Sequence, residues 1–294
     1  DSINNNSAIK PYRIWGKYTS KQYELRVGLQ KIDFGSASLL RPLQWFNQLN
    51  YRDPLRLSNG VNAVLGRYYF LNNANVWLWA LYGNTKQRGY DIFNSNAKLP
   101  EFGGRVQYPL NKGEIALSYH YRFIDASTLI LNDNSAAIAE NKIGFDIRLD
   151  YKMGIWFEGS YSNKAKNLGL LSNQMLLNIG SDYTLGIGNG LMLIAEHLLS
   201  SQYQHEINFK NTLGISAVTA SYPFSLFDNI STVVYHDWKQ KNTALFLNYE
   251  HQFKYISTYI MTFLSQSNES NTNNNDQLNN FASSGIRLML VYNH

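Results

Sequence analysis

The sequence predicts an all-β chain that folds as a transmembrane, antiparallel up-and-down β-barrel. Three observations lead to this fold class. Apolar and polar residues alternate with a period of two over many short segments, which is typical of half-buried strands. Short turns alternate along the chain with longer polar connections, and aromatic residues lie at the ends of the segments. In outer-membrane barrels the short turns lie at the periplasmic end and the long loops lie outside.

Composition narrows the class of protein. The chain has 294 residues, no cysteine, 21 tyrosines and 14% aromatic residues. Without cysteine it holds no disulfides, thiolate metal sites or cysteine nucleophiles. Its mean hydropathy is −0.33, and no apolar run reaches the roughly 18 residues that a membrane-spanning helix needs. A barrel fits this hydropathy, because only alternate residues of its strands face lipid. The net charge of +5 comes from scattered basic residues, so nucleic-acid binding is not predicted.

The pattern begins with two adjacent segments. Residues 9–18 and 22–34 both alternate, and a short turn at 19–21 joins them. In the second segment Glu24 and Arg26 stand opposite a row of apolar residues. That arrangement indicates a strand with one apolar and one polar face.

The remaining segments repeat the pattern. The clearest is 142–151, where Asp146 and Arg148 stand opposite apolar residues, whereas 76–82 is apolar on both faces and leaves its orientation open. Turns or polar loops bound the other candidate strands, which span residues 60–70, 102–108, 114–123, 155–161, 176–185, 191–199, 213–222, 230–238, 244–253, 255–264 and 285–292.

The strand count is 15, and bacterial single-chain barrels normally have an even number. The first segment also runs toward the short-turn end, whereas a barrel with a periplasmic N-terminus starts with a strand in the other direction. We therefore expect about 16 strands, with 18 as the alternative. Either the beginning of the barrel is missing from this chain, or the count of segments misses or splits a strand. Residues 1–294 are expected to form one transmembrane domain.

A soluble sheet with one solvated face is the alternative fold. Three features favour the barrel. Tyrosines lie at strand ends, where amphipathic rings suit the membrane interfaces. The segments have about the 9 to 11 residues that a tilted strand needs to cross a bilayer. Finally, the proposed inward positions carry full charges, which a packed sandwich core would not hold unpaired.

One region resembles a known family. The residues RVGLQKIDFGSASLLRPLQWF, followed by YRDPL and GVNAVLGRYYF, are similar to a pattern in porin-like outer-membrane families that include the alginate-export porins. Gly28, Gln30, Phe34, Gly35 and residues 52–55 match that pattern. The resemblance implies a channel of about 18 strands with loops folded into the lumen. The arginine-rich lumen expected for an acidic polysaccharide is only partly present, so the resemblance carries over fold and broad role but not substrate.

Residues 35–57 form the first long connection and are the main candidate site. The connection is too apolar for disorder, and long loops are usually functional when they are ordered. We expect it to fold inward as a constriction, whose charged residues meet an anionic or hydroxyl-rich solute. Trp45, Phe46 and Tyr51 would stack on sugar rings or pack against the wall. The candidate pore-lining residues are Arg41, Arg52, Asp53 and Arg56 in the connection, and Glu24, Arg26, Arg105, Arg122, Asp146 and Arg148 on the wall.

The alternative is a structural plug, in which the arginines of this connection pair with wall carboxylates such as Glu24 and Asp146. The charged inward positions hold equal numbers of basic and acidic residues, so strong charge selectivity is not expected.

No catalytic, metal or cofactor site is predicted. The six histidines show no metal-ligand spacing, and no nucleotide-binding motif is present. His236 and Asp237 are similar to the acid–histidine pairing of outer-membrane proteases, but no second acidic pair accompanies them. His197 shares the face of Leu191 and Leu193, and the sequence indicates no serine partner for it, so a lipid-facing esterase site is not predicted.

The expected function is a non-enzymatic channel for passive passage of small polar or anionic solutes such as saccharides. Pore width and lumen charges would set rate and selectivity. The expected location is the outer membrane of a Gram-negative bacterium, in contact with lipids and lipopolysaccharide, as a single chain, a homo-oligomer or part of a larger complex. The alternative is a closed barrel that serves as an accessory or scaffold of an outer-membrane assembly.

Overall fold

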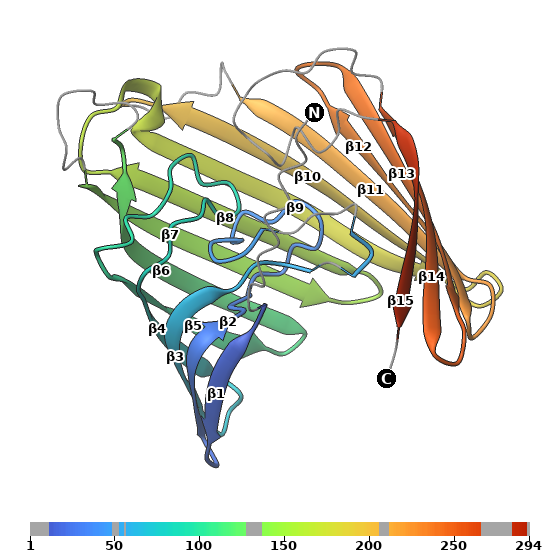
Figure 1. The fold of residues 1–294 in the computed structure, drawn as a ribbon, viewed down its shortest axis with the longest axis horizontal. Helices are drawn as coiled ribbons and strands as arrows, with labels where there is room; N and C mark the ends of the chain where they lie inside the picture. Colours follow the sequence, from blue (N-terminus) through green and yellow to red (C-terminus); the bar gives the residue numbers. More distant parts are fainter. Residues whose placement is uncertain are drawn as a thin grey trace, which may run out of the picture.

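The computed structural model confirms an all-β chain with antiparallel, up-and-down strand order. The described residues are 12–48, 53–55, 57–127, 137–205, 212–265 and 284–292. Within them, 15 strands form one sheet in which each strand pairs with its neighbours in sequence. Figure 1 shows this sheet as a strongly curved wall with β1 and β15 at its edges.

The strands follow the period-two segments of the sequence closely. Their bounds are β1 Ile14–Thr19, β2 Tyr23–Gln30, β3 Val61–Tyr69, β4 Asn75–Leu81, β5 Glu101–Leu110, β6 Gly113–Asp125, β7 Ala137–Asp150, β8 Gly154–Lys164, β9 Asn173–Leu185, β10 Leu191–Tyr203, β11 Leu213–Pro223, β12 Asp228–Asp237, β13 Asn242–Gln252, β14 Ile256–Ser265 and β15 Gly285–Tyr292. The largest difference is at β7, which begins five residues before the predicted start at 142 and extends the hairpin with β6.

Helices contribute almost nothing to the described part of the chain. One 3-10 turn, Gly169–Leu171, lies between β8 and β9. No helix in the described residues is long and apolar enough to cross a membrane.

The described sheet has neither the predicted even number of strands nor the pairing of its two edge strands that would close a barrel. Within the described residues, β1 and β15 pair with β2 and β14 respectively and not with each other. The predicted first strand, 9–18, also begins in residues outside the described part, and its described portion starts at Ile14.

The two faces of the sheet differ in an unusual way. On one side of β5–β9 the register pairs Val106 with Leu117, Leu117 with Phe145, and Phe157 with Ile179. Four of the five are more than a third exposed, up to 59% for Leu117. We call this apolar side of the sheet the outer face. The neighbouring positions on β6, which are Ser118, His120 and Arg122, are buried on the opposite, inner face.

A connection covers this polar inner face. Residues 31–48, which follow β2 and are called the inner loop here, are mostly buried, and 39–47 are all buried. Figure 1 shows this blue segment, together with the teal segment after β4, in front of the middle strands of the sheet. The core of the protein therefore lies between the inner loop and the inner face.

Candidate functional site

Aromatic rings hold the inner loop against the first strands. The ring of Phe34 stacks on Trp79 with centroids 5.6 Å apart, and Phe46 lies 5.3 Å from Trp79 and 5.0 Å from His120. Trp45 donates its indole N–H to the hydroxyl of Ser160, 3.0 Å away. Trp79 comes from the strand whose orientation the sequence left open, and the structure turns it inward. Trp45 and Phe46 thus pack against the wall, which was the second of their two expected roles.

A glycine on the wall makes room for this packing. A Cβ atom at Gly144 on β7 would stand 2.3 Å from the side chain of Leu43 and 2.9 Å from the ring of Trp45. These distances are too short for real carbon atoms, so the inner loop lies this close to β7 because residue 144 has no side chain.

Two wall carboxylates, Glu158 on β8 and Glu196 on β10, bind the backbone of the inner loop. We call them the carboxylate pair. Glu196 accepts N–H bonds from Ser38, Leu39 and Leu40, with shortest distances of 2.6, 3.1 and 2.6 Å. Both carboxylates are at most 4% exposed. Three consecutive N–H groups on one carboxylate form a strong, charge-assisted contact.

Glu158, on β8, also accepts backbone N–H groups of the inner loop. It accepts the N–H of Ala37 at 3.0 Å and that of Leu43 at 2.7 Å. Asn178, which faces Glu158 across the β8–β9 pair, donates to the carbonyl oxygen of Leu40 at 2.8 Å. The wall therefore binds the inner loop through main-chain groups, whereas the plug hypothesis expected arginine side chains to do so.

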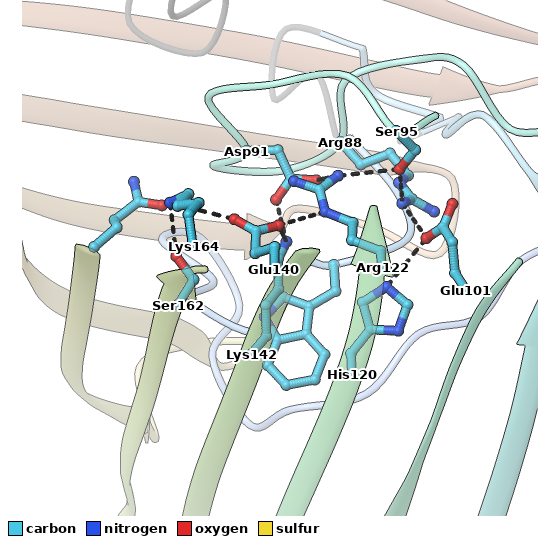
Figure 2. Close-up of polar contacts among 12 residues, drawn as sticks. Arg88, Asp91, Ser95, Glu101, His120, Arg122, Glu140, Lys142, Ser162 and Lys164 are labelled. Atoms are coloured by element: carbon cyan, nitrogen blue, oxygen red, sulfur yellow. Dashed lines mark hydrogen bonds and ion pairs between the residues drawn. The ribbon is translucent and has the colours of Figure 1, made fainter. Parts of the chain in front are cut away.

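A second connection brings charged residues to the inner face (Figure 2). Arg88 and Asp91 come from the segment after β4. Arg88 lies 2.5 Å from Glu101 on β5, and Asp91 lies 2.6 Å from Arg122 on β6. Together with strand residues they form what we call the charged cluster: Arg88, Asp91, Glu101, His120, Arg122, Glu140, Lys142 and Lys164.

The charged cluster is buried and internally paired. Arg122 also binds Glu140 on β7, which in turn lies 3.2 Å from Lys164 on β8. His120 receives the indole N–H of Trp79 on Nδ1 at 3.1 Å, so its Nε2 carries the proton toward Glu101. Every member is at most 7% exposed. Buried charges of this kind are tolerated only when they are paired and hydrogen-bonded.

The predicted wall residues also pair with each other. Arg105 forms a two-bond contact with Asp146, at 2.6 and 2.9 Å, and both are at most 3% exposed. Glu24 lies 2.9 Å from Lys17 and 2.7 Å from Arg26.

Arg148 pairs with Asp150 and Asp182 at 2.9 and 2.7 Å, nearer the short-turn end of the sheet. Its side chain is 27% exposed. Among the wall residues Arg105, Asp146 and Arg148, only Arg148 therefore retains substantial solvent access.

The arginine expected at the constriction takes a different place. Arg41 is 7% exposed, lies 2.6 Å from Asp33, and donates to the carbonyl oxygen of Phe34 at 3.0 Å. These two contacts lie within the inner loop. The pairing of Arg41 with a wall carboxylate therefore stays a prediction.

Three other candidate pore-lining residues belong to the first long connection, namely Asp53, Arg52 and Arg56. Asp53 accepts the N–H groups of Leu55 and Leu57 at 3.0 and 3.1 Å, which is a local turn contact. Arg52 and Arg56 lie outside the described residues.

Several residues of the site were not among the candidates. Glu140 and Lys142 belong to the same face as Asp146, and continuing the period of two backward from 142 would have included Glu140. Arg88 and Asp91 lie in an irregular connection, and nothing in their spacing indicates partners on β5–β7.

A serine–histidine contact on the outer face also corrects the sequence analysis. His197 on β10 lies 2.9 Å through Nδ1 from the hydroxyl of Ser216, its direct neighbour on β11. The same hydroxyl accepts the indole N–H of Trp238 at 2.8 Å. The serine partner thus exists, but no carboxylate contacts His197 in the described residues, so the pair lacks the third group that orients a catalytic histidine.

The pH dependence of the inner loop can be predicted at Asp33, which lies in the connection after β2. Burial raises the pKa of this carboxyl, but Arg41 and Lys31 more than offset burial and hold the pKa below its usual value. A lowered pKa contributes stability at higher pH that is lost as pH falls through it. We expect wild-type protein to exceed Asp33→Asn in free energy of unfolding at pH 7, with the difference shrinking below about pH 4. Denaturant unfolding in micelles would measure this, and a pH-independent difference would contradict it.

Comparison with known proteins does not assign the chain to a family. No protein-family model matches the chain, and no curated protein sequence matches it. In the described residues no group of three or more His, Cys, Asp or Glu side chains could hold a metal ion. The assignment of function must therefore rest on the faces of the sheet and on what covers them.

Proposed function

We propose that the chain forms a β-barrel in the outer membrane of a Gram-negative bacterium. The barrel would act as a porin-like channel for passive passage of small polar or anionic solutes such as saccharides. The observation that carries the proposal is the reversed polarity of the sheet. Apolar side chains such as Leu117 at 59% and Ile179 at 57% exposure cover the outer face, whereas charged side chains are buried on the inner face. A soluble monomer rarely exposes a continuous apolar face of this size.

Lipid would cover the outer face in this proposal. Exposed tyrosines lie at or beside strand ends, including Tyr82, Tyr108, Tyr151 and Tyr292, where they suit the two membrane interfaces. The open edges of β1 and β15 support closure with about 16 strands, or 18, since unpaired backbone groups are costly inside a bilayer. Closure could occur within one chain or in an oligomer.

The solute path would run along the inner face past the inner loop. Residues 35–57 would narrow the pore, and passage would depend on how firmly the carboxylate pair holds residues 37–43. Because the charged cluster is internally paired, its charges would influence solutes less than unpaired lumen charges do.

A closed barrel that serves as an accessory or scaffold of a membrane assembly is the second candidate. The observation that favours it is the same inner loop, which is buried and bound to two strands through main-chain hydrogen bonds. In that case the inner loop would be a seal.

Single-channel conductance in a planar bilayer would separate the two candidates. The intact protein would be compared with a variant that lacks residues 36–50. Steady conductance that increases on deletion is the result expected for a constricted channel. Silence from the intact protein, with conductance only after deletion, would favour the sealed barrel. Silence from both proteins would overturn the channel proposal.

A further inference from the structure

A cavity of about 330 Å³ lies where the first two long connections meet. Its lining comes from the end of the inner loop at Phe46, from residues 59–62 at the start of β3, and from residues 83–88 after β4. Tyr12, whose side chain is 50% exposed, completes one side. The cavity therefore opens at the long-loop end of the sheet, which the proposed function places outside the cell.

The chemistry of this lining is dominated by side-chain amides. An amide group carries both hydrogen-bond donors and an acceptor, so it can match a hydroxyl group in either role. The amide residues of the lining are Asn47, Gln48, Asn59, Asn62, Asn84 and Gln87.

The charge of the cavity is small. Lys86 and Arg88 are the charged residues among the described lining residues. Arg88 lies 2.5 Å from Glu101, so its charge is already matched inside the protein. Lys86 is exposed, where solvent and salt screen its charge. This lining suits an uncharged polar molecule better than an anion.

Two buried polar groups of the lining still lack partners. Asn47 is 2% exposed and Arg88 is 4% exposed. The side-chain oxygen of Asn47, together with Nε and Nη1 of Arg88, has no hydrogen-bond partner in the described part of the chain. Leaving buried donors and acceptors unpaired is costly. These three atoms are closed to solvent, so the hydroxyl groups of a bound molecule would reach them only after neighbouring side chains move.

We propose that this cavity is a binding site for a neutral, hydroxyl-rich ligand, namely one end of a small saccharide. The amides contact the hydroxyl groups, and the face of the Tyr12 ring that Arg13 does not cover offers an apolar surface to a sugar face. The volume lies near the lower end of the range for small-molecule sites, which fits one or two sugar rings rather than a long polymer. The inference deepens the proposed channel function by naming a solute class and a place where it binds before entry.

Isothermal titration calorimetry on the full chain in detergent micelles tests the site. Maltose and cellobiose are the neutral probes, glucuronate is the anionic probe, and inorganic phosphate is the control ion. We expect at least one neutral sugar to bind and both anions to bind more weakly. Tighter binding of glucuronate or phosphate than of any neutral sugar would overturn the proposed ligand class.

The matched variants are Gln48→Ala with Asn59→Ala, against Asn111→Ala. Gln48 and Asn59 line the cavity and make no hydrogen bond to another described residue, so the fold should persist, and circular dichroism would check it. Asn111 is an exposed amide in the β5–β6 turn at the other end of the sheet. The double variant should bind the neutral sugar about tenfold or more weakly, and Asn111→Ala should bind as wild type does. Unchanged affinity in the double variant would overturn the site.

Conductance separates failure of this inference from failure of the proposed function. Conductance without binding of any neutral sugar would overturn the cavity site and leave the channel standing. Binding without conductance would support the site and count against the channel.

Discussion

An Arg122→Met variant should lose about 3 to 5 kcal/mol of folding free energy. Arg122 is 0% exposed and lies between Asp91 and Glu140. Methionine would fill much of the space but would remove one of the cations beside each carboxylate, leaving Asp91 with Lys142 and Glu140 with Lys164. Removing one partner from a buried ion-pair network is strongly destabilising. Urea unfolding in micelles, followed by tryptophan fluorescence, would measure the loss.

Arg148→Met is the matched control for this change. Arg148 also pairs with two carboxylates, Asp150 and Asp182, but its side chain is 27% exposed. Partly exposed pairs contribute about 0 to 1 kcal/mol, so we expect a small effect. Equal losses in the two variants would mean that burial of the charged cluster does not determine its contribution.

Removing the carboxylate pair should release the inner loop. In the Glu158→Ala, Glu196→Ala double variant, the N–H groups that now bind these side chains, including those of Leu40 and Leu43, lose their partners. Hydrogen bonds to charged groups contribute about 1.5 to 3 kcal/mol each, so we expect the bound position to weaken by about 3 kcal/mol or more. Chymotrypsin should then cleave after Trp45 more than a hundredfold faster than in wild type, which follows from about 1.4 kcal/mol per factor of ten.

Glu250→Ala is the control for this experiment, because Glu250 lies on β13 and accepts a hydrogen bond from the hydroxyl of Tyr259 at 3.1 Å. Its cleavage rate should equal that of wild type. If the double variant resists chymotrypsin as wild type does, aromatic packing alone holds the inner loop. The same double variant should conduct more than wild type in a planar bilayer if the barrel is a constricted channel.

The sequence predicted the strands and their faces because side chains of a strand must alternate. The segment 285–292 has the bounds of β15, and the polar positions Ser118, His120 and Arg122 lie together on the inner face. The start of β7 was missed because residues 137–141 carry few strand-favouring side chains, although the alternation continues through Glu140.

The contacts of the inner loop depended on the tertiary structure. The sequence indicated that 35–57 is too apolar to lie in water, but it could not show which wall groups bind it. Ala37 and Glu158 are 121 residues apart, and the contact uses a backbone N–H that every non-proline residue possesses. Side-chain patterns carry no information about such a contact.

The charged cluster was also predicted only in part from the sequence, and the tertiary structure decided the rest. Alternation placed Arg122 and Arg105 on the inner face, but the expected surroundings were water. The structure instead brings Asp91 from an irregular connection to within 2.6 Å of Arg122. Local periodicity determines the direction in which a strand residue points, whereas its partner depends on how distant connections fold over the sheet. For this protein the sequence therefore determined the wall, and only the tertiary structure decided what fills it.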